Sequence, residues 1–274
     1  MRQGRPSPFI PIDDPEDPRV AAYRHVRERD LVGRDGGFIA EGEVVLRVLV
    51  MGGGPHRAAS LLIDPKRLDK LGPLIAALPE ETPVYAASQA VLDAIAGFPL
   101  HRGILAHGLR APDPGAAALL AGLGDQALVL ALHGVANHDN MGGLFRNAAA
   151  FGVDAVVLDP TCCDPLYRKA IRVSVGAALK VPFARVRGDE DLLDRLEAAG
   201  LQVLALSPQG AEPLAGVTRP PRAALLLGAE GPGLPADVLA CARTLSIAMS
   251  PGWDSLNVAA AAAVALHELT RRAR

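Results

Sequence analysis

The chain has few cysteines, few aromatic residues and no hydrophobic run long enough to cross a membrane. Its 274 residues include three cysteines (Cys162, Cys163 and Cys241), and 4% of the residues are aromatic. Three thiols do not form a disulfide framework, and no cysteine or histidine spacing matches a zinc site. Residues 258–266 form the longest apolar run, which is too short and too rich in alanine to span a bilayer. Because the N-terminus also lacks the apolar core of a signal peptide, we expect a soluble cytoplasmic protein that needs no metal.

The chain also lacks an excess of basic charge. It has 28 Lys and Arg against 30 Asp and Glu, which gives a formal net charge of −2. Dedicated nucleic-acid binders usually carry a basic excess, so the total charge argues weakly against that class. The local balance differs, because residues 19–34 contain five arginines and His25 against Glu28 and Asp30.

Alanine, glycine and leucine are abundant, and half of the residues are apolar. Short apolar runs alternate with segments of helical periodicity, which is typical of an α/β protein. In the C-terminal half these runs are continuous, so they indicate strands buried on both faces of a parallel sheet. We predict a flexible N-terminal arm (1–18), a small α/β domain (19–110), a linker (111–125) and a parallel-sheet domain (126–274).

The same patterns predict the order of the elements. In the smaller domain we predict helices at 18–29, 41–50, 66–77 and 88–96, and strands at 58–63, 84–86 and 103–106. In the larger domain we predict strands at 127–132, 154–158, 181–186, 202–206, 223–227 and 244–249. The helices predicted there are 141–150, 166–179, 190–199, 235–242 and 256–271.

Two junctions between a strand and a loop predict a ligand site near the C-terminus. The apolar run 225–227 leads into a loop whose glycines let the backbone approach a ligand closely. These glycines are Gly228, Gly231 and Gly233. The run 245–249 leads into a second turn, after which Ser255 and Asn257 precede an alanine-rich helix. Because parallel strands end at the same edge of a sheet, the junctions predict a crevice for a small molecule, with Glu230 inside it.

An earlier junction, residues 137–152, contains one arginine within a helix of small and apolar residues. Asn140 stands where the N-cap of the following helix is expected, and Arg146 is the single cation among small and apolar residues. On its own, such an arginine is more often a snorkelling side chain on a solvated helix face. The alternative is a guanidinium directed at phosphate, which its planar fork binds through two hydrogen bonds.

Four motifs occur in one order between residues 127 and 272. The first, Asn-x-x-Asn-x-Gly-x-x-x-Arg-x-Ala, comprises Asn137, Asn140, Gly142, Arg146 and Ala148. The second is the stretch Arg172-Val-Ser-Val-Gly176. The third, Gly-x-Glu-Gly-x-Gly, comprises Gly228, Glu230, Gly231 and Gly233. The fourth comprises Ile247, Met249, Ser255, Leu256, Asn257 and Val258. Together they resemble the SpoU/TrmH family of RNA 2′-O-ribose methyltransferases, in the SPOUT superfamily.

The resemblance implies methyl transfer from S-adenosyl-L-methionine (AdoMet) to a ribose 2′-hydroxyl of ribosomal or transfer RNA. It also implies a deep trefoil knot in the C-terminal domain, which is rare among folds, and no metal. The residues that correspond to catalytic positions of the family are Arg146, Asn140, Glu230, Ser255 and Asn257. Those that correspond to cofactor-binding positions are Leu206, Leu227, Gly228, Gly231, Ile247, Met249 and Leu256.

The family also suggests roles for these side chains. Arg146 would hold the RNA phosphate; a role as base is open, although an ordinary guanidinium does not give up its proton. Glu230 would fix Arg146 or polarise a donor. Two departures are Ala248, where the family has proline, and Trp253-Asp254, which add bulk before Ser255. The N-terminal region resembles the substrate-binding domain only loosely, through residues 101–106.

A homodimer through the C-terminal domain is expected on two grounds. A helix such as 258–266, apolar on all sides, must be covered on all sides, whereas a sheet covers one face. In the family, the dimer places the first-motif arginine of one subunit near the cofactor of the other. The alternative is that the N-terminal domain covers this helix within one subunit.

Two other function classes remain open at this point. The first is an AdoMet- or RNA-binding module of the same fold that has lost turnover. The second is a Rossmann-type oxidoreductase, but residues 137–143 do not have the glycine spacing that a dinucleotide requires. Residues 52–55, Gly-Gly-Gly-Pro, lack the Lys-Ser/Thr of a phosphate loop and indicate a turn.

Overall fold

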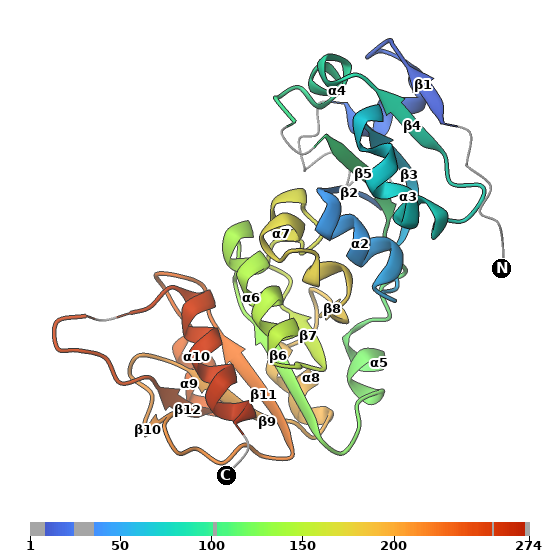
Figure 1. Ribbon diagram of the computed structural model, residues 1–274. Coiled ribbons are helices and arrows are strands. Elements are labelled where there is room, and N and C mark those ends of the chain that lie inside the picture. Colours follow the sequence, from blue (N-terminus) through green and yellow to red (C-terminus); the bar gives the residue numbers. More distant parts are fainter. Residues whose placement is uncertain (1–8, 25–35, 101–102, 254, 272–274) are drawn as a thin grey trace. The chain divides into compact units, whose positions relative to one another are not determined.

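The computed structural model describes residues 9–24, 36–100, 103–253 and 255–271 (Figure 1). The chain divides into two compact units: residues up to 111 with 166–180 form the first, and residues 112–165 with those from 181 onward form the second. Some predicted features lie outside the described residues. These are the start of the arm, most of the arginine-rich segment 19–34, His101 and Arg102 of the stretch 101–106, and Asp254.

The first unit is built on a five-stranded mixed sheet in the order β1-β4-β3-β5-β2. The strands are β1 (Ile10–Ile12), β2 (Gly37–Glu41), β3 (Arg57–Ile63), β4 (Val84–Ala87) and β5 (Ile104–Leu109). β4 pairs in parallel with both β1 and β3, whereas β5 lies antiparallel between β3 and β2.

Helices cover both faces of this sheet. On one face η1 (Pro18–Tyr23) and α4 (Gln89–Ala96) pack with alternate strand residues such as Leu62 and Tyr85. Side chains in a strand alternate between faces, so the other buried strand residues face the opposite side. There the strands contact α2 (Glu43–Met51), and α2 contacts α3 (Leu68–Ala76), which follows η2 (Pro65–Arg67).

Three features of this unit differ from the prediction. The predicted flexible arm contains β1, and Ile12 is buried in the core. The predicted helix 18–29 is a short 3-10 helix, because the backbone at Arg24 is extended. Strand β2 was not predicted at all, since its five residues are recognisable only through pairing with β5, which lies far along the chain.

The second unit is built on a seven-stranded sheet in the order β10-β12-β9-β11-β6-β7-β8, and every pairing is parallel. The strands are β6 (Ala127–Leu132), β7 (Ala155–Leu158), β8 (Phe183–Arg185), β9 (Gln202–Leu206), β10 (Glu212–Pro213), β11 (Arg222–Leu227) and β12 (Arg243–Ser246). The prediction of a parallel α/β sheet, made from the continuous apolar runs, is confirmed.

Both faces of the second sheet are covered, as continuous apolar strands require. α6 (His138–Ala150) and α10 (Val258–Thr270) lie side by side on one face and pack closely together. α5 (Ala116–Ala121), α8 (Leu192–Ala198) and α9 (Ala236–Cys241) contribute to the apolar core on the other face.

Four further predictions need correction. The predicted linker 111–125 contains α5, which was missed although Ala116 and Leu120 are buried in the core. The single helix predicted at 166–179 is two pieces, α7 (Arg168–Val173) and η3 (Ala177–Leu179), because two residues between them, Val175 and Gly176, are left-handed. This segment packs with the first unit, not with the domain 126–274 to which the sequence assigned it. Finally, the predicted strand 244–249 ends at Ser246.

Candidate functional site

Three loops at the carboxyl edge of the second sheet line a cavity of about 660 Å³. They follow β9, β11 and β12, and residues 255–258 and Ala261 at the start of α10 complete the wall. This volume lies within the usual range for small-molecule sites. All seven residues predicted to bind a cofactor line the cavity: Leu206, Leu227, Gly228, Gly231, Ile247, Met249 and Leu256. Three predicted catalytic residues, Glu230, Ser255 and Asn257, also line it.

The loop after β11 folds back on itself and brings its backbone into the cavity. Ala229 and Gly233 form an isolated antiparallel bridge, in which the Gly233 N–H donates to the Ala229 carbonyl (3.1 Å). A Cβ at Gly228 would lie 2.6 Å from the Gly233 oxygen and from the Leu234 nitrogen. Gly228 is therefore required by the fold of the loop itself. The sequence predicted glycine here for a different reason, the close approach of a ligand.

Asn257 joins three separate segments of the site. Its side-chain oxygen caps α10 by accepting from the N–H groups of Ala259 (3.0 Å) and Ala260 (3.2 Å). Its side-chain nitrogen donates to Asn140 Oδ1 (2.8 Å) and to Glu230 Oε1. One amide thus holds together the start of α6, the loop after β11 and the start of α10.

Asn140 has a different local role from the one its position predicted. The N-cap of α6 is Asn137, whose side chain accepts from the N–H groups of Asp139 (2.8 Å) and Asn140 (3.2 Å). Asn140 lies in the first helical turn and is 7% exposed. With its backbone capped by Asn137, its buried side chain is available to accept from Asn257.

Arg146 lies on the exposed side of α6. Within the part of the chain that the structure describes, its guanidinium has no ion pair and no hydrogen bond. The expected contact with Glu230 is not present there, since Glu230 instead accepts from Asn257. Arg146 is thus an exposed fork on a helix surface, and its donors are open to a ligand.

The contact between α6 and α10 is close because of Gly143, whose place in the sequence predicts close packing of this turn but not its partner. A Cβ at Gly143 would lie 2.8 Å from the Ala259 side chain, so only glycine allows this approach. Asn147 Nδ2 donates to the Ala259 carbonyl (2.6 Å). The polar Asn147 directly after Arg146 was the signal in the sequence for this contact.

A buried polar cluster supports the loops after β6 and β7. Asp159 is 5% exposed and accepts from the N–H groups of Gly134 (3.1 Å) and Cys162 (2.9 Å). Arg185 donates to the carbonyls of Asp159 (2.7 Å) and Cys162 (2.9 Å). Sequence reasoning gave no role to Asp159 or Arg185, because the hydrogen bonds to Gly134 and from Arg185 join segments far apart in the chain.

The two adjacent cysteines lie in this supported loop and are not activated. Burial raises the pKa of the Cys162 thiol to about 12, with a further contribution from the Asp159 carboxylate. Burial raises the pKa of the Cys163 thiol to about 11. Thiols with such pKa values stay protonated at neutral pH and are poor nucleophiles.

Two kinds of feature are absent from the described residues. No cluster of three or more His, Cys, Asp or Glu side chains there is placed to hold a metal ion. No helix within the same ranges has the length and apolar character that crossing a membrane would need.

Comparison with known proteins gives one family. The model of the SpoU rRNA Methylase family matches residues 127–267. An uncharacterized tRNA/rRNA methyltransferase of Mycobacterium tuberculosis is 42% identical over 270 residues, which cover 95% of this chain and 91% of that protein. The 23S rRNA (guanosine-2′-O-)-methyltransferase RlmB of Acinetobacter baylyi is 34% identical over 227 residues, or 80% of this chain and 91% of that one.

Solved structures with the same fold include the AdoMet-bound rRNA methyltransferase of Sinorhizobium meliloti. The TM-score is 0.79 at 22% identity, and the match covers 95% of this chain and 97% of that one. The SpoU methyltransferase AviRb of Streptomyces viridochromogenes, in complex with AdoMet, gives a TM-score of 0.72 at 23% identity. That match covers 89% of this chain and 95% of that one.

Proposed function

The chain belongs to the SpoU rRNA methylase family, and from this premise we propose that it transfers a methyl group from AdoMet to a ribose 2′-hydroxyl of ribosomal or transfer RNA. The observation that carries the proposal is the joining of Asn140, Glu230 and Asn257 beside a cavity lined by every residue predicted to bind the cofactor. A cytoplasmic location, where these RNAs are found, is part of the proposal.

The cavity suits a cofactor that has both an apolar ring and polar groups. Apolar side chains from three loops, such as Leu206, Ile247 and Leu256, provide contact area. The glycine-containing loop 228–233 presents backbone donors and acceptors in place of side chains. When bound, AdoMet supplies an electrophilic methyl group. The protein's part is to hold this group and to orient the RNA.

Arg146 is proposed to orient the RNA by binding phosphate. A 2′-hydroxyl is a weak nucleophile at neutral pH, so its placement against the methyl group matters greatly. A guanidinium stays protonated and has a planar fork that fits phosphate oxygens. The absence of a protein partner for Arg146 among the described residues supports this role. In this proposal another group removes the proton of the 2′-hydroxyl.

The activity is tested by incubating the protein with tritiated AdoMet and with purified ribosomal or transfer RNA. Label in RNA, followed by mapping of 2′-O-methyl positions in a deletion strain against wild type, identifies the substrate. AdoMet binding without transfer to either RNA would favour the alternative, an inactive binding module. Binding of NAD in place of AdoMet would contradict both.

Gly228→Ala provides a test of the cavity. A methyl group at this position collides with the backbone of the same loop, so we expect a loss of stability of about 1–3 kcal/mol. Displacement of the loop should also weaken AdoMet binding by about tenfold or more, measured by calorimetry. Gly124→Ala is the control, because a Cβ there meets nothing within 4 Å and its φ is ordinary. Unchanged AdoMet affinity in Gly228→Ala would place the cofactor elsewhere.

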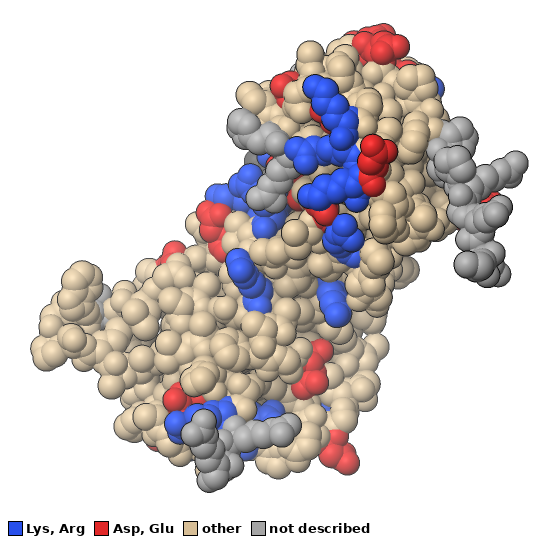
Figure 2. Space-filling model, viewed as in Figure 1, with Lys and Arg blue, Asp and Glu red and all other residues tan. Residues whose placement is uncertain are grey.

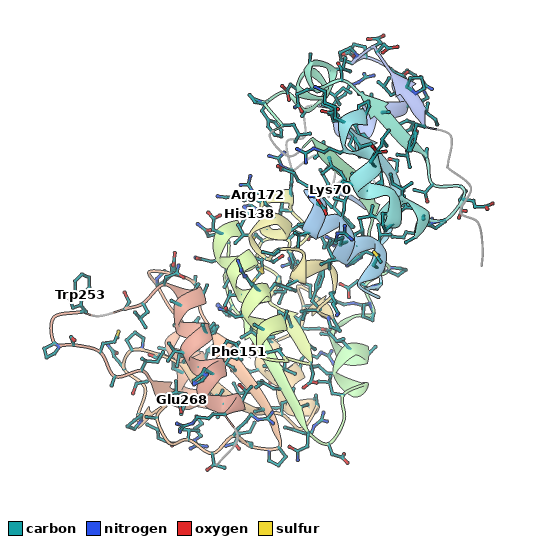
Figure 3. All side chains as sticks on the ribbon, in the orientation of Figure 1. Lys70, His138, Phe151, Arg172, Trp253 and Glu268 are labelled. Atoms are coloured by element: carbon teal, nitrogen blue, oxygen red, sulfur yellow. The ribbon has the colours of Figure 1, made fainter. Side chains whose placement is uncertain are left out.

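We also propose a homodimer through the exposed side of α10. The buried residues of α10 all lie on one side of the helix, whereas Leu256 and Val264 are 45% and 42% exposed. Trp253, in the loop before α10, is 76% exposed (Figure 3). Exposed apolar side chains on α10 and in the segment before it favour an interface there.

Val264→Arg is expected to convert the dimer into a monomer, because it would bury an unpaired charge at the interface. Sedimentation at tens of micromolar measures the change. The matched control is Ala240→Arg, which adds the same charge at an exposed position of α9. The interface is elsewhere if Val264→Arg still sediments as a dimer, and a wild-type monomer would contradict the assembly itself.

The trefoil knot is a further part of the proposal. It is supported by the order of the second sheet, in which β11 lies between β6 and β9. Both of these strands precede β11 in the chain. An experimental trace of residues 204–257 would test it. We propose in addition that the first unit binds the RNA substrate.

A further inference from the structure

Charge is divided unequally between the two units. The first unit, residues 1–111 with 166–180, contains 18 Lys and Arg against 14 Asp and Glu. The second contains 10 Lys and Arg against 16 Asp and Glu. The formal net charge of −2 is therefore the sum of a positively charged first unit and a negatively charged second unit.

Within the first unit, the surplus comes from the segment 166–180, because residues 1–111 contain 14 Lys and Arg against 14 Asp and Glu. That segment contains four cations and no acid, and one of the four, Arg168, pairs with Glu41 of β2 (3.6 Å). On the neighbouring helices, Lys70 and Arg47 share one carboxylate, that of Glu43, at 2.7 and 3.0 Å. Figure 2 shows Lys and Arg gathered on the visible side of this unit, and Figure 3 labels Lys70 of α3 and Arg172 of α7.

The opposite face of the same sheet has no such surplus among its described residues. On and beside η1, Arg19 pairs with Asp17 (2.5 Å) and Arg24 pairs with Glu16 (2.7 Å). Each cation there has its own carboxylate. The two faces of one sheet thus differ in how far their positive charge is neutralised.

Exposed apolar side chains accompany the surplus cations. Val44 and Met51 of α2 are 57% and 56% exposed, and Val48 lies between them on the same side of the helix. A Cβ at Gly176 would lie 3.1 Å from Val48, so the end of the 166–180 segment packs directly on this stripe. The adjacent Val175 is 36% exposed.

The backbone of Val175 is strained. Its φ is +55°, the left-handed region that β-branched residues rarely adopt, and no other described non-glycine residue has a positive φ. The Val175 N–H donates to the Arg172 carbonyl (3.1 Å), and the Gly176 N–H donates to the Ile171 carbonyl (2.9 Å). At a helix end with these two hydrogen bonds, the residue in the position of Val175 is usually glycine. A strained residue whose side chain is exposed suggests that the side chain itself has a use.

We propose that α2, α3 and the segment 166–180 form an RNA-binding surface that takes an RNA with unpaired nucleotides. This phosphate-and-base surface comprises Val44, Arg47, Met51, Lys70, Arg172 and Val175. Its cations contact phosphates, and its apolar side chains contact the faces of unstacked bases. Base faces are accessible in loops and bulges, whereas a regular duplex hides them. The inference rests on the proposed function for its choice of RNA as partner.

Two synthetic RNAs test the surface: a hairpin with an unpaired loop and a duplex of equal length. Wild-type protein is expected to bind the hairpin more tightly, with an affinity that falls steeply as salt rises. Lys70→Ala and Arg172→Ala should each weaken binding to both RNAs several-fold and lower the salt slope by about one. Arg19→Ala, which removes the same charge on the opposite face, is the control and should change neither.

Val175→Gly separates a role in binding from a role in folding. Glycine relieves the backbone strain, so the melting temperature should rise by roughly 2–4 °C. The same change removes the exposed side chain and should reduce the preference for the hairpin. A purely structural residue would shift the melting temperature and leave the hairpin preference unchanged, which would overturn the role given to Val175.

The outcomes distinguish this surface from the proposed catalytic function. If wild type binds RNA through these residues but methylates none, the surface stands and the proposed activity fails. If RNA is methylated while Lys70→Ala and Arg172→Ala keep wild-type binding and salt slopes, the surface is wrong. Equal wild-type affinity for hairpin and duplex would overturn the preference for unpaired nucleotides. Loss of dimer sedimentation in these variants would also overturn the proposal, because it would make the surface a protein interface.

Discussion

Arg146→Ala is expected to abolish methyl transfer while AdoMet binding stays within a few-fold of wild type. The guanidinium is exposed on α6, and it is outside the set of residues that line the cavity. Its loss should therefore affect RNA placement, for which a reduction of about 100-fold or more is reasonable, since misplaced reactants lose rate steeply. The measurements are transfer of tritiated methyl to RNA and calorimetry of AdoMet binding.

Arg146→Lys makes the test more specific. It retains the positive charge but replaces the planar fork with a point charge, so turnover should also fall strongly. The melting temperature of both variants should match wild type, because the side chain has no partner among the described residues. Near wild-type turnover in Arg146→Lys would show that charge alone suffices and that the bidentate role is wrong.

Asn257→Asp is expected to inactivate the enzyme and yet leave the fold largely intact. Aspartate still accepts from the N–H groups of Ala259 and Ala260, and it is as good an N-cap as asparagine. It loses the N–H donors that reach Asn140 and Glu230, and it faces the Glu230 carboxylate with a like charge. The bridge between the three segments is therefore broken while the helix cap remains.

Asn257→Ala is the companion variant. It removes both the cap and the bridge, so it should lose about 1 kcal/mol of stability from the cap as well as the activity. Methyl transfer and chemical unfolding of both variants give the comparison. If Asn257→Asp retained activity and Asn257→Ala did not, the residue would act through the helix cap and the bridge would have no role in catalysis.

The parallel sheet of the second unit and the loops that line the cavity could be predicted from patterns in the sequence. Continuous apolar runs require burial on both faces, and glycines placed just after such runs mark the loops that a ligand approaches. These signals are local, because strand, turn and helix start are each encoded within a few neighbouring residues. For the same reason Gly228 and Ile247 could be assigned from their motifs, and both line the cavity.

Which polar groups meet could not be predicted from the sequence and depends on the folded arrangement. The Asn257–Asn140 hydrogen bond joins residues 117 positions apart, and it gives Glu230 a partner other than the expected Arg146. Likewise, the segment 166–180 has a helical pattern in the sequence, but it packs with the first unit and bends at Val175. The physical reason is common to these cases. A side chain's hydrogen-bond partners and a segment's packing depend on which distant strands pair, and no local pattern contains that information.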